Sequence, residues 1–182
     1  MQDKFIIFVI GKDRTGIVAG VSEILYKNKF NIEDSSMTIL EDHFAMILII
    51  SAREKQQIPE LKKKFQKIGE KLHLTISIKR FTAVPGEKEP AGFVEPYIIT
   101  LIGADKIGIV YRITKLIAEE SINITDVRTE IIGQEKSPVY TMILEIEIPS
   151  HVKKGIFKSS LKKLGKDLNV EITLKPIDVL EL

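Results

Sequence analysis

The chain has 182 residues, of which 29% are charged and 44% hydrophobic, a composition typical of globular proteins. Its 27 Lys and Arg residues nearly balance 25 Asp and Glu residues, so a net charge of +2 does not provide the positive field of most nucleic-acid-binding domains. The absence of cysteine excludes disulfides, iron–sulfur ligation and thiol catalysis, and the three histidines argue against a structural zinc site.

The first apolar segment, residues 4–10, is a short run of β-forming residues that predicts a buried strand. Its apolar part, Phe5 to Ile10, is too short for the core of a signal peptide or for a membrane span. We therefore expect a cytoplasmic protein that does not associate with a membrane.

The segment after this strand occurs twice in the chain. Residues 10–18, IGKDRTGIV, return as residues 102–110, IGADKIGIV, at an offset of 92 residues (102 − 10). Residues 67–72 match residues 163–168 at an offset of 96 (163 − 67), which places a four-residue insertion in the second copy, at the turn 133–138. The repeat predicts two domains, 1–82 and 96–182, joined by a linker at 83–95 that is rich in Pro, Gly and charge.

Hydrophobic periodicity predicts the same order of elements in both copies. Strands are expected at 4–10, 33–40, 44–51 and 74–81, and again at 96–102, 125–132, 139–148 and 170–177. Apolar residues at helical spacing mark two helices in each copy. In the first copy these are Ile17, Val21, Ile24 and Leu25, then Leu61, Phe65, Ile68 and Leu72 in a helix that begins near Pro59; in the second they are Ile109, Ile113, Leu116 and Ile117, then Val152, Ile156, Leu161, Leu164 and Leu168.

The order β-α-β-β-α-β favours an α+β fold with two ferredoxin-like domains in tandem. Each domain is expected to have a four-stranded antiparallel sheet with both helices on one face. The other sheet face lacks a cover and the edge strands are free to pair, so we expect a homo-oligomer. The sequence leaves open whether the two copies pair within one chain or between chains.

The loop between the first strand and the first helix is the strongest candidate site in each copy. Gly11 to Gly16, and Gly103 to Gly108, join a strand end to a helix start, where free backbone N–H groups and the positive end of the helix dipole bind anions. In one interpretation Asp13 and Asp105 cap the helices; in the other, Gly16 and Gly108 let a ligand approach the backbone. Neither loop has the pattern of a phosphate loop or a dinucleotide fingerprint.

Asn31 and Asn123 follow the first helix of each copy. Asparagine often ends a helix in left-handed geometry, which is one interpretation. In the other, its amide faces the strand–helix loop and helps to hold an amino acid. The helix N–H groups would then bind the ligand's carboxylate, and Asp13 or Asp105 with an asparagine carbonyl would bind its ammonium group.

The pattern Gly-x-Asp-Arg/Lys-x-Gly-Ile-Val, followed by an amphipathic helix and Asn-Ile-x-Asp, resembles the ACT domain, a regulatory amino-acid-binding module of ferredoxin-like fold. The resemblance covers nearly the whole chain apart from the linker, and two such modules without an attached enzyme look like the glycine cleavage system transcriptional repressor family. It implies an amino acid, with glycine as the expected ligand, bound where two modules pair. The positions that it implicates are Gly11, Asp13, Arg14, Thr15, Gly16, Ile17 and Asn31, with Gly103, Asp105, Lys106, Ile107, Gly108, Ile109 and Asn123 in the second copy. Several ACT domains have proline where Thr15 or Ile107 stands here.

Three functions are compatible with these observations. We favour a non-catalytic regulatory protein that senses an amino acid and signals to a protein partner, a regulator or an enzyme, in transcriptional control of amino-acid metabolism. The alternatives are an ACT-fold adaptor or dimerisation module without a ligand, and a detached regulatory subunit of an amino-acid biosynthetic enzyme. We expect no catalysis, no cofactor or metal, and no direct nucleic-acid contact, because the sequence shows no nucleophile elbow, paired carboxylates or helix-turn-helix.

The second helix of each copy is rich in lysine. The main interpretation is a solvated outer helix face, and the minority alternative is a surface for an acidic partner protein. The lysines are Lys62, Lys63, Lys64, Lys67 and Lys71 in the first copy, and Lys153, Lys154, Lys158, Lys162, Lys163 and Lys166 in the second.

Overall fold

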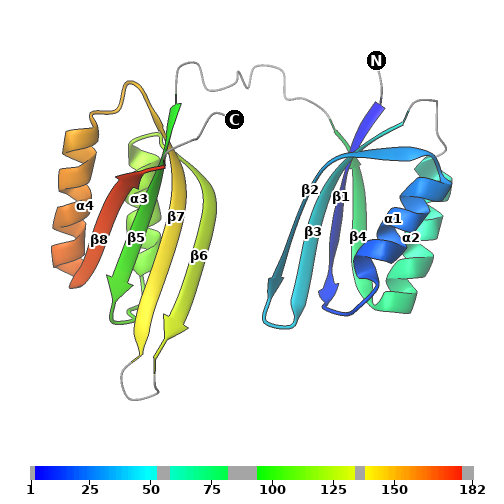
Figure 1. Cartoon of the computed structure of the whole chain (residues 1–182), viewed down its shortest axis with the longest axis horizontal. Helices are drawn as coiled ribbons and strands as arrows, with labels where there is room; N and C mark the ends of the chain where they lie inside the picture. Colours follow the sequence, from blue (N-terminus) through cyan, green and yellow to red (C-terminus); the bar gives the residue numbers. More distant parts are fainter. Residues whose placement is uncertain (1–2, 53–57, 82–93, 134–137, 178–182) are drawn as a thin grey trace. The chain divides into compact units, whose positions relative to one another are not determined.

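The computed structural model describes residues 3–52, 58–81, 94–133 and 138–177, and the chain divides into two compact units, residues 1–85 and 86–182 (Figure 1). Each unit has the predicted order β-α-β-β-α-β. Each contains a four-stranded antiparallel sheet and two helices, which confirms the predicted α+β ferredoxin-like fold.

The first unit consists of β1 (Asp3–Lys12), α1 (Ile17–Lys27), β2 (Phe30–Leu40), β3 (His43–Ala52), α2 (Ile58–Leu72) and β4 (Leu74–Arg80). Its strand order is β2-β3-β1-β4. β2 and β4 are therefore the edges of the sheet, and β1 lies next to β3 and β4.

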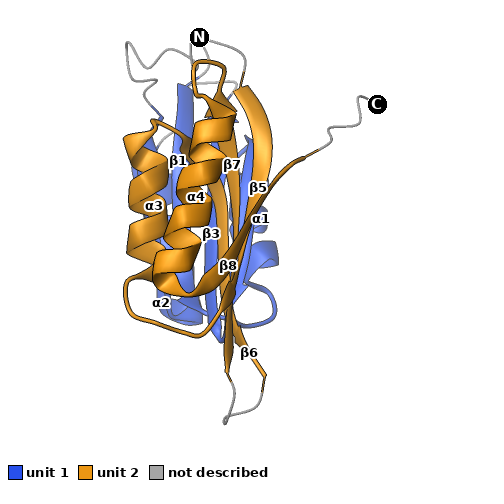
Figure 2. Ribbon diagram, turned by 90° about the vertical axis from the view of Figure 1, so that its left-hand side faces the viewer, with its two compact units in different colours: residues 1–85 blue, residues 86–182 orange. Residues whose placement is uncertain are grey.

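The second unit consists of β5 (Val94–Gly103), α3 (Ile109–Glu119), β6 (Asn123–Ile132), β7 (Val139–Pro149), α4 (Lys154–Leu168) and β8 (Val170–Pro176), with strand order β6-β7-β5-β8. Figure 2 shows α3 and α4 side by side over this sheet. β5 begins two residues before the predicted strand, so Val94 and Glu95 belong to the sheet rather than to the linker. The rest of the predicted linker, residues 83–93, lies outside the described residues.

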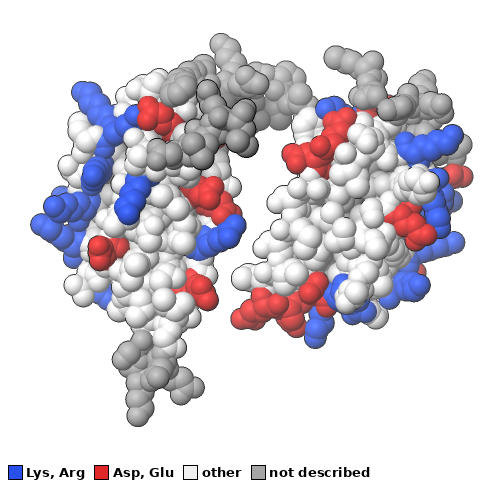
Figure 3. Space-filling model, in the orientation of Figure 1, with Lys and Arg blue, Asp and Glu red and all other residues white. Residues whose placement is uncertain are grey.

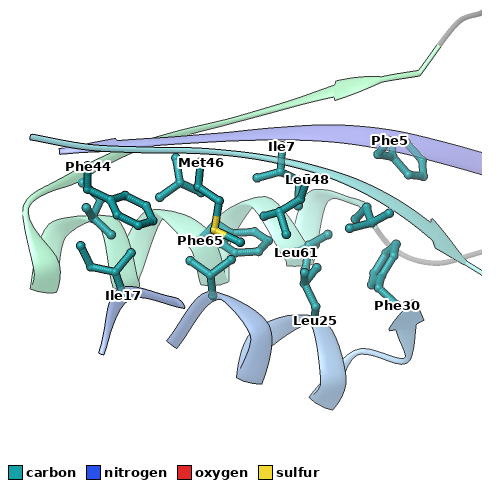
Figure 4. Close-up of a cluster of buried hydrophobic side chains, with 14 of the residues drawn as sticks. Phe5, Ile7, Ile17, Leu25, Phe30, Phe44, Met46, Leu48, Leu61 and Phe65 are labelled. Carbon is teal, nitrogen blue, oxygen red and sulfur yellow. The ribbon is translucent and has the colours of Figure 1, made fainter. Parts of the chain in front are cut away.

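The core of each unit lies between the sheet and its helices. In the first unit, Ile7 of β1 and Leu48 of β3 point toward Leu25 of α1 and toward Leu61 and Phe65 of α2, and all five are buried (Figure 4). Burial of each such side chain contributes about 1.5–3 kcal/mol, so this alternation of the strands fixes which sheet face the helices cover.

The start of α4 differs from the predicted helical pattern. Ile156, expected in the core, is 57% exposed, and Phe157 is buried in its place. Val152 is buried but lies in a turn before the helix, where its N–H donates to the carbonyl oxygen of Pro149 at 3.0 Å. Helical spacing counted from Val152 therefore predicts that Ile156 is buried, one residue before Phe157, which the helix buries in fact.

The two hairpin turns explain the change of offset between the copies. Leu40 pairs with His43 across a two-residue turn, whereas Ile132 pairs with Val139 and leaves residues 133–138 between them. The four extra residues lie where the sequence placed the insertion. No described helix is long and apolar enough to cross a membrane.

The outer faces of the two sheets, away from the helices, differ in character. In the first unit the central strands place Ile10 and Ile47 on this face, 53% and 44% exposed, with Phe8 half-buried between them. In the second unit Ile102 and Ile143 lie at the matching positions of this face, 45% and 39% exposed, and Glu145 and Glu147 of β7 lie on the same face. Each unit therefore leaves an apolar sheet face without a helix, and the face of the second unit also carries acidic side chains.

Candidate functional site

The loop between β1 and α1 ends in a helix start that no side chain caps. Gly16 is the N-cap residue, with φ 94° and ψ −3°, and Gly108 takes the same left-handed conformation before α3. Neither helix has a side-chain capping hydrogen bond, so the interpretation that Asp13 and Asp105 cap the helices is wrong. The first helical bond of α1 runs from the N–H of Gly20 to the carbonyl of Gly16, which leaves the N–H groups of Ile17, Val18 and Ala19 available to an acceptor.

The open space at Gly16 and Gly108 suits a ligand that approaches the backbone. A Cβ atom built on either residue meets nothing within 4 Å. Glycine is needed there for the positive φ, since other residues rarely adopt it.

Gly11 and Gly103 must be glycine for a different reason: each packs closely against other residues of its own unit. A Cβ on Gly11 would lie 2.8 Å from the carbonyl oxygen of His73, and a Cβ on Gly103 would lie 2.9 Å from the Cβ of Val170. The strand end and the start of the edge strand approach too closely for any side chain. Close packing within the unit therefore accounts for the missing side chain at Gly11 and Gly103.

The middle of the first loop presents polar side chains to solvent and is fixed at its base. Asp13, Arg14 and Thr15 are exposed. The N–H of Asp13 donates to the carbonyl oxygen of Asp42 in the β2–β3 turn at 2.7 Å, and Lys12 lies 3.3 Å from the carboxylate of Asp42. The hydrogen bond from Lys12 lowers the pKa of Asp42 below its ordinary value of 3.8. This turn therefore holds the loop from one side.

Asp42 and Lys12 were not among the sequence candidates. The signal that could have found them is the pairing of β1 with β3, which brings the β2–β3 turn beside the end of β1.

The second loop uses its cation within the fold and exposes an apolar residue. Lys106 donates from Nζ to the carbonyl oxygen of Leu168, at the end of α4, at 2.9 Å. Ile107 is fully exposed, where the first loop has Thr15, and Asp105 is also exposed. The second loop therefore offers fewer free polar groups than the first.

Ile17 and Ile109 belong to the core. Both are 1% exposed, so their side chains cannot reach a ligand at the helix start. The N–H of Ile109 also donates to the carbonyl oxygen of Lys106 at 3.4 Å.

The asparagines lie at the opposite end of each sheet from the loops. Asn31 pairs with Ser51, which pairs with Lys4 near the start of β1, whereas Gly11 is seven residues further along β1 (11 − 4). At about 3.3 Å per residue this separation is roughly 23 Å. An asparagine therefore cannot face the loop of its own copy, and that expectation is wrong.

Neither asparagine ends a helix in left-handed geometry either. Lys29 and Ser121 adopt the positive φ after α1 and α3, and Asn31 and Asn123 are strand residues. Both are exposed, but the amide of Asn123 donates to Glu147 at 3.3 Å. Each sheet thus has two separated polar positions, a loop at one end and an asparagine at the other.

No group of three metal-ligating side chains lies close enough to hold a metal ion in the described part of the chain.

Comparison with known proteins places these features in a family. The sequence profile of the ACT domain matches residues 3–79 and 95–175, so it covers both units. A UPF0237 protein of Streptococcus mutans is 45% identical over 76 residues, which is 42% of this chain and 86% of that protein. A UPF0237 protein of Methanocaldococcus jannaschii is 42% identical over 79 residues, 43% of this chain and 88% of that protein.

Two solved structures match the chain over its whole length. An unknown protein from Galdieria sulphuraria has a TM-score of 0.79 and 25% identity over 98% of this chain and 100% of that one. A protein described as a glycine cleavage system transcriptional repressor has a TM-score of 0.71 and 18% identity over 98% of this chain and 99% of that one, which shows a shared fold. The chain therefore belongs to the ACT-domain family, with two ACT domains in tandem that are related to the UPF0237 proteins.

Proposed function

We propose that this chain is a non-catalytic regulatory protein that binds a free amino acid at the β1–α1 loop and signals the bound state to a protein partner. The observation that supports the proposal is the uncapped start of α1, where Gly16 leaves the backbone open and Asp13 lies nearby in the sequence. An amino acid has one anionic and one cationic group, and this loop offers a partner for each.

The ligand's carboxylate binds the free N–H groups at the start of α1. The positive end of the helix dipole adds to this attraction, and a basic side chain is not required. Arg14, which is exposed in the same loop, supplies a further positive charge.

The ligand's ammonium group binds Asp13 and the carbonyl oxygen of an asparagine. Because Asn31 is at the far end of its own sheet, the asparagine must come from a second module, such as that of another copy of the chain. We favour the first loop, because Lys106 of the second is engaged with Leu168 and Asn123 with Glu147.

This composite site gives the sensor its mechanism. A ligand that touches two modules stabilises the arrangement in which the loop of one meets the asparagine of the other. The free-energy shift toward that arrangement is no larger than the difference in the ligand's binding free energy between it and the arrangement in which the two modules are apart. A partner that distinguishes the arrangements then responds to the amino acid.

Glycine is the first ligand to test, and transcriptional control of amino-acid metabolism is the proposed setting. Both follow from the sequence resemblance to the glycine cleavage repressor family. An enzyme that takes the chain as a detached regulatory subunit is the alternative partner.

A thermal-shift panel of amino acids tests the proposal. An amino acid at 100 times its Kd raises the free energy of unfolding by about 2.7 kcal/mol, so the responsive ligand stands out by a higher Tm. Acetate and methylamine, each of which carries one of glycine's two charged groups, serve as matched controls and should have little effect. If no amino acid raises the Tm at millimolar concentration, the sensor proposal fails and an adaptor without a ligand is favoured.

A further inference from the structure

A groove runs along the open edge of β8 in the second unit. It has a volume of about 810 Å³ and lies between α4 and β8. Leu161 of α4 with Ile172 and Leu174 of β8 line it on the helix side, and Thr173 and Lys175 line it on the other face of the strand. Because residues from both faces of β8 line the groove, it includes the strand's edge itself.

The backbone at this edge has hydrogen-bonding groups without a strand partner among the described residues. β8 pairs only with β5 in the described sheet. The N–H of Ile177 donates to the carbonyl oxygen of Pro96 at 2.9 Å, so by strand alternation Thr173 and Lys175 also direct their backbone groups to β5. Ile172 and Leu174 direct theirs outward, where an added strand would lie.

Lysines line the same groove. Lys158, Lys162 and Lys166 recur at every fourth position of α4, so they form one row on the helix, and all three are exposed. They form no ion pair with a described residue. Figure 3 shows Lys and Arg side chains gathered at the left margin, over α4 and β8.

The first unit has the same groove without this charge. Its groove, about 620 Å³, is lined by Lys62, Gln66 and Glu70 at the positions of the three lysines. Gln66 donates to Glu70 at 3.2 Å, and the three side chains sum to no net charge. The positive charge is therefore a property of the second groove and not of the fold.

The spacing of the lysines fits an extended acidic peptide. Residues four apart in an α-helix are about 6 Å apart along its axis, and residues two apart in a strand are about 6.6–6.8 Å apart. Glutamates at every second position of a strand therefore have nearly the same spacing as the three lysines. A row of lysines also discourages β8 from pairing with a second β8, because like charges would meet.

We propose that the second unit binds an acidic, extended segment of a partner protein as an added strand on β8, antiparallel to it, with its alternate carboxylates against Lys158, Lys162 and Lys166. In this register the acidic residues lie opposite Ile172 and Leu174, and their backbone N–H groups face β8. Their methylene groups cover the apolar floor of the groove. This surface is separate from the proposed amino-acid site, so each proposal can fail without the other.

The test uses the full chain and a fluorescein-labelled heptapeptide, TEVEVET, followed by fluorescence anisotropy at low salt. The variant K162Q/K166E copies the side chains of the first groove into the second, and we expect peptide affinity to fall roughly tenfold. The reciprocal variant Q66K/E70K gives the first groove the lysine row, and we expect it to gain a second binding site. Circular dichroism confirms that both variants are folded, and the amino-acid thermal shift should be unchanged in both.

Modified peptides distinguish an added strand from charge attraction alone. N-methylation of the glutamate residues removes the N–H groups that face β8 and should abolish binding, whereas N-methylation of the valines should preserve it. The peptide TKVKVKT should not bind. Equal affinity of TEVEVET for K162Q/K166E and the wild type, or no effect of N-methylation at the glutamates, would overturn the proposal.

Discussion

Gly16 and Gly108 show how single residues determine the candidate site. Each occupies a left-handed conformation at a helix start, and each faces open space. The conformation leaves the helix N–H groups uncapped and the space leaves them accessible. Both features depend on the missing side chain.

Replacement of Gly16 by alanine should destabilise the first unit by about 1–2 kcal/mol, because an alanine is strained at a positive φ even where there is room for it. Gly155→Ala is the matched control, since Gly155 is helical and also faces open space, and it should stabilise the chain by about 0.5–1 kcal/mol. Urea unfolding measures both, and equal effects of the two substitutions would contradict this account of Gly16.

Glu33 makes stability depend on acid pH. A hydrogen bond from Lys4, with one from Ser51, lowers the pKa of Glu33 below its ordinary value of 4.5. The resulting stabilisation is complete above the pKa of the unfolded chain and is lost as the pH falls through the folded-state pKa. The Tm should therefore fall below about pH 4.5, and Glu33→Gln should make this fall shallower.

Lys4→Met removes the donor of this hydrogen bond and should flatten the acid limb of the Tm profile in the same way. A profile identical to that of the wild type in both variants would show that this pair does not set the acid dependence.

At the level of elements, the close approach of each second helix to the edge strand depends on one glycine. A Cβ on Gly69 would lie 2.8 Å from the carbonyl oxygen of Leu74, and a Cβ on Gly165 would lie 2.9 Å from that of Val170. Backbone atoms cannot move aside as a flexible side chain can. The helix and strand must separate to admit a methyl group.

Gly69→Ala and Gly165→Ala should each therefore cost about 1–3 kcal/mol of stability. Guanidinium unfolding of each variant, with Gly155→Ala as the control, measures the cost. A loss below about 0.5 kcal/mol in both variants would mean that the helices shift freely along the sheet.

The sequence predicted the elements well because their apolar periodicities are strong. The strand at 44–51 and the helix with Ile109, Ile113 and Ile117 match the structure closely. In α4 the prediction holds for Leu161, Leu164 and Leu168, which lie on the core face. It is wrong only at Ile156, because the turn at Val152 precedes the helix start and breaks the count. Periodicity identifies a buried face, but not the residue at which a helix begins.

The candidate site was only partly predictable. The Gly-Asp motif placed the loop at a helix start, since that depends on chain order alone. The position of Asn31 was also predictable, because a helix after β1 runs back along the sheet and the next strand then begins at the end opposite Gly11. The reason for glycine at position 11 was not, because it depends on contact with His73, far away in sequence.

At the level of the whole molecule, the outer face of the first sheet favours self-association. Ile10 and Ile47 are exposed on a face that no helix of the first unit covers. We expect a dimer or higher oligomer, with a light-scattering mass of at least about twice 20.6 kDa. Ile47→Lys should shift the equilibrium toward the monomer, and a wild-type mass of 20.6 kDa at high micromolar concentration would exclude association in solution.

The central claim is that an amino acid is held by the loop of one module and the asparagine of another. Isothermal titration calorimetry of the amino acid identified by thermal shift, with the wild type, Asn31→Ala and Asn123→Ala, tests it most directly. Loss of one hydrogen bond to the charged ligand costs about 1.5–3 kcal/mol, so Asn31→Ala should weaken binding roughly 10- to 150-fold. Asn28→Ala is the control, because that side chain bonds within its own unit, to Ile24 and Lys64, and the variant should bind normally. Wild-type affinity in both Asn31→Ala and Asn123→Ala, with a ligand that binds the unmodified chain, would contradict the account and place the site elsewhere.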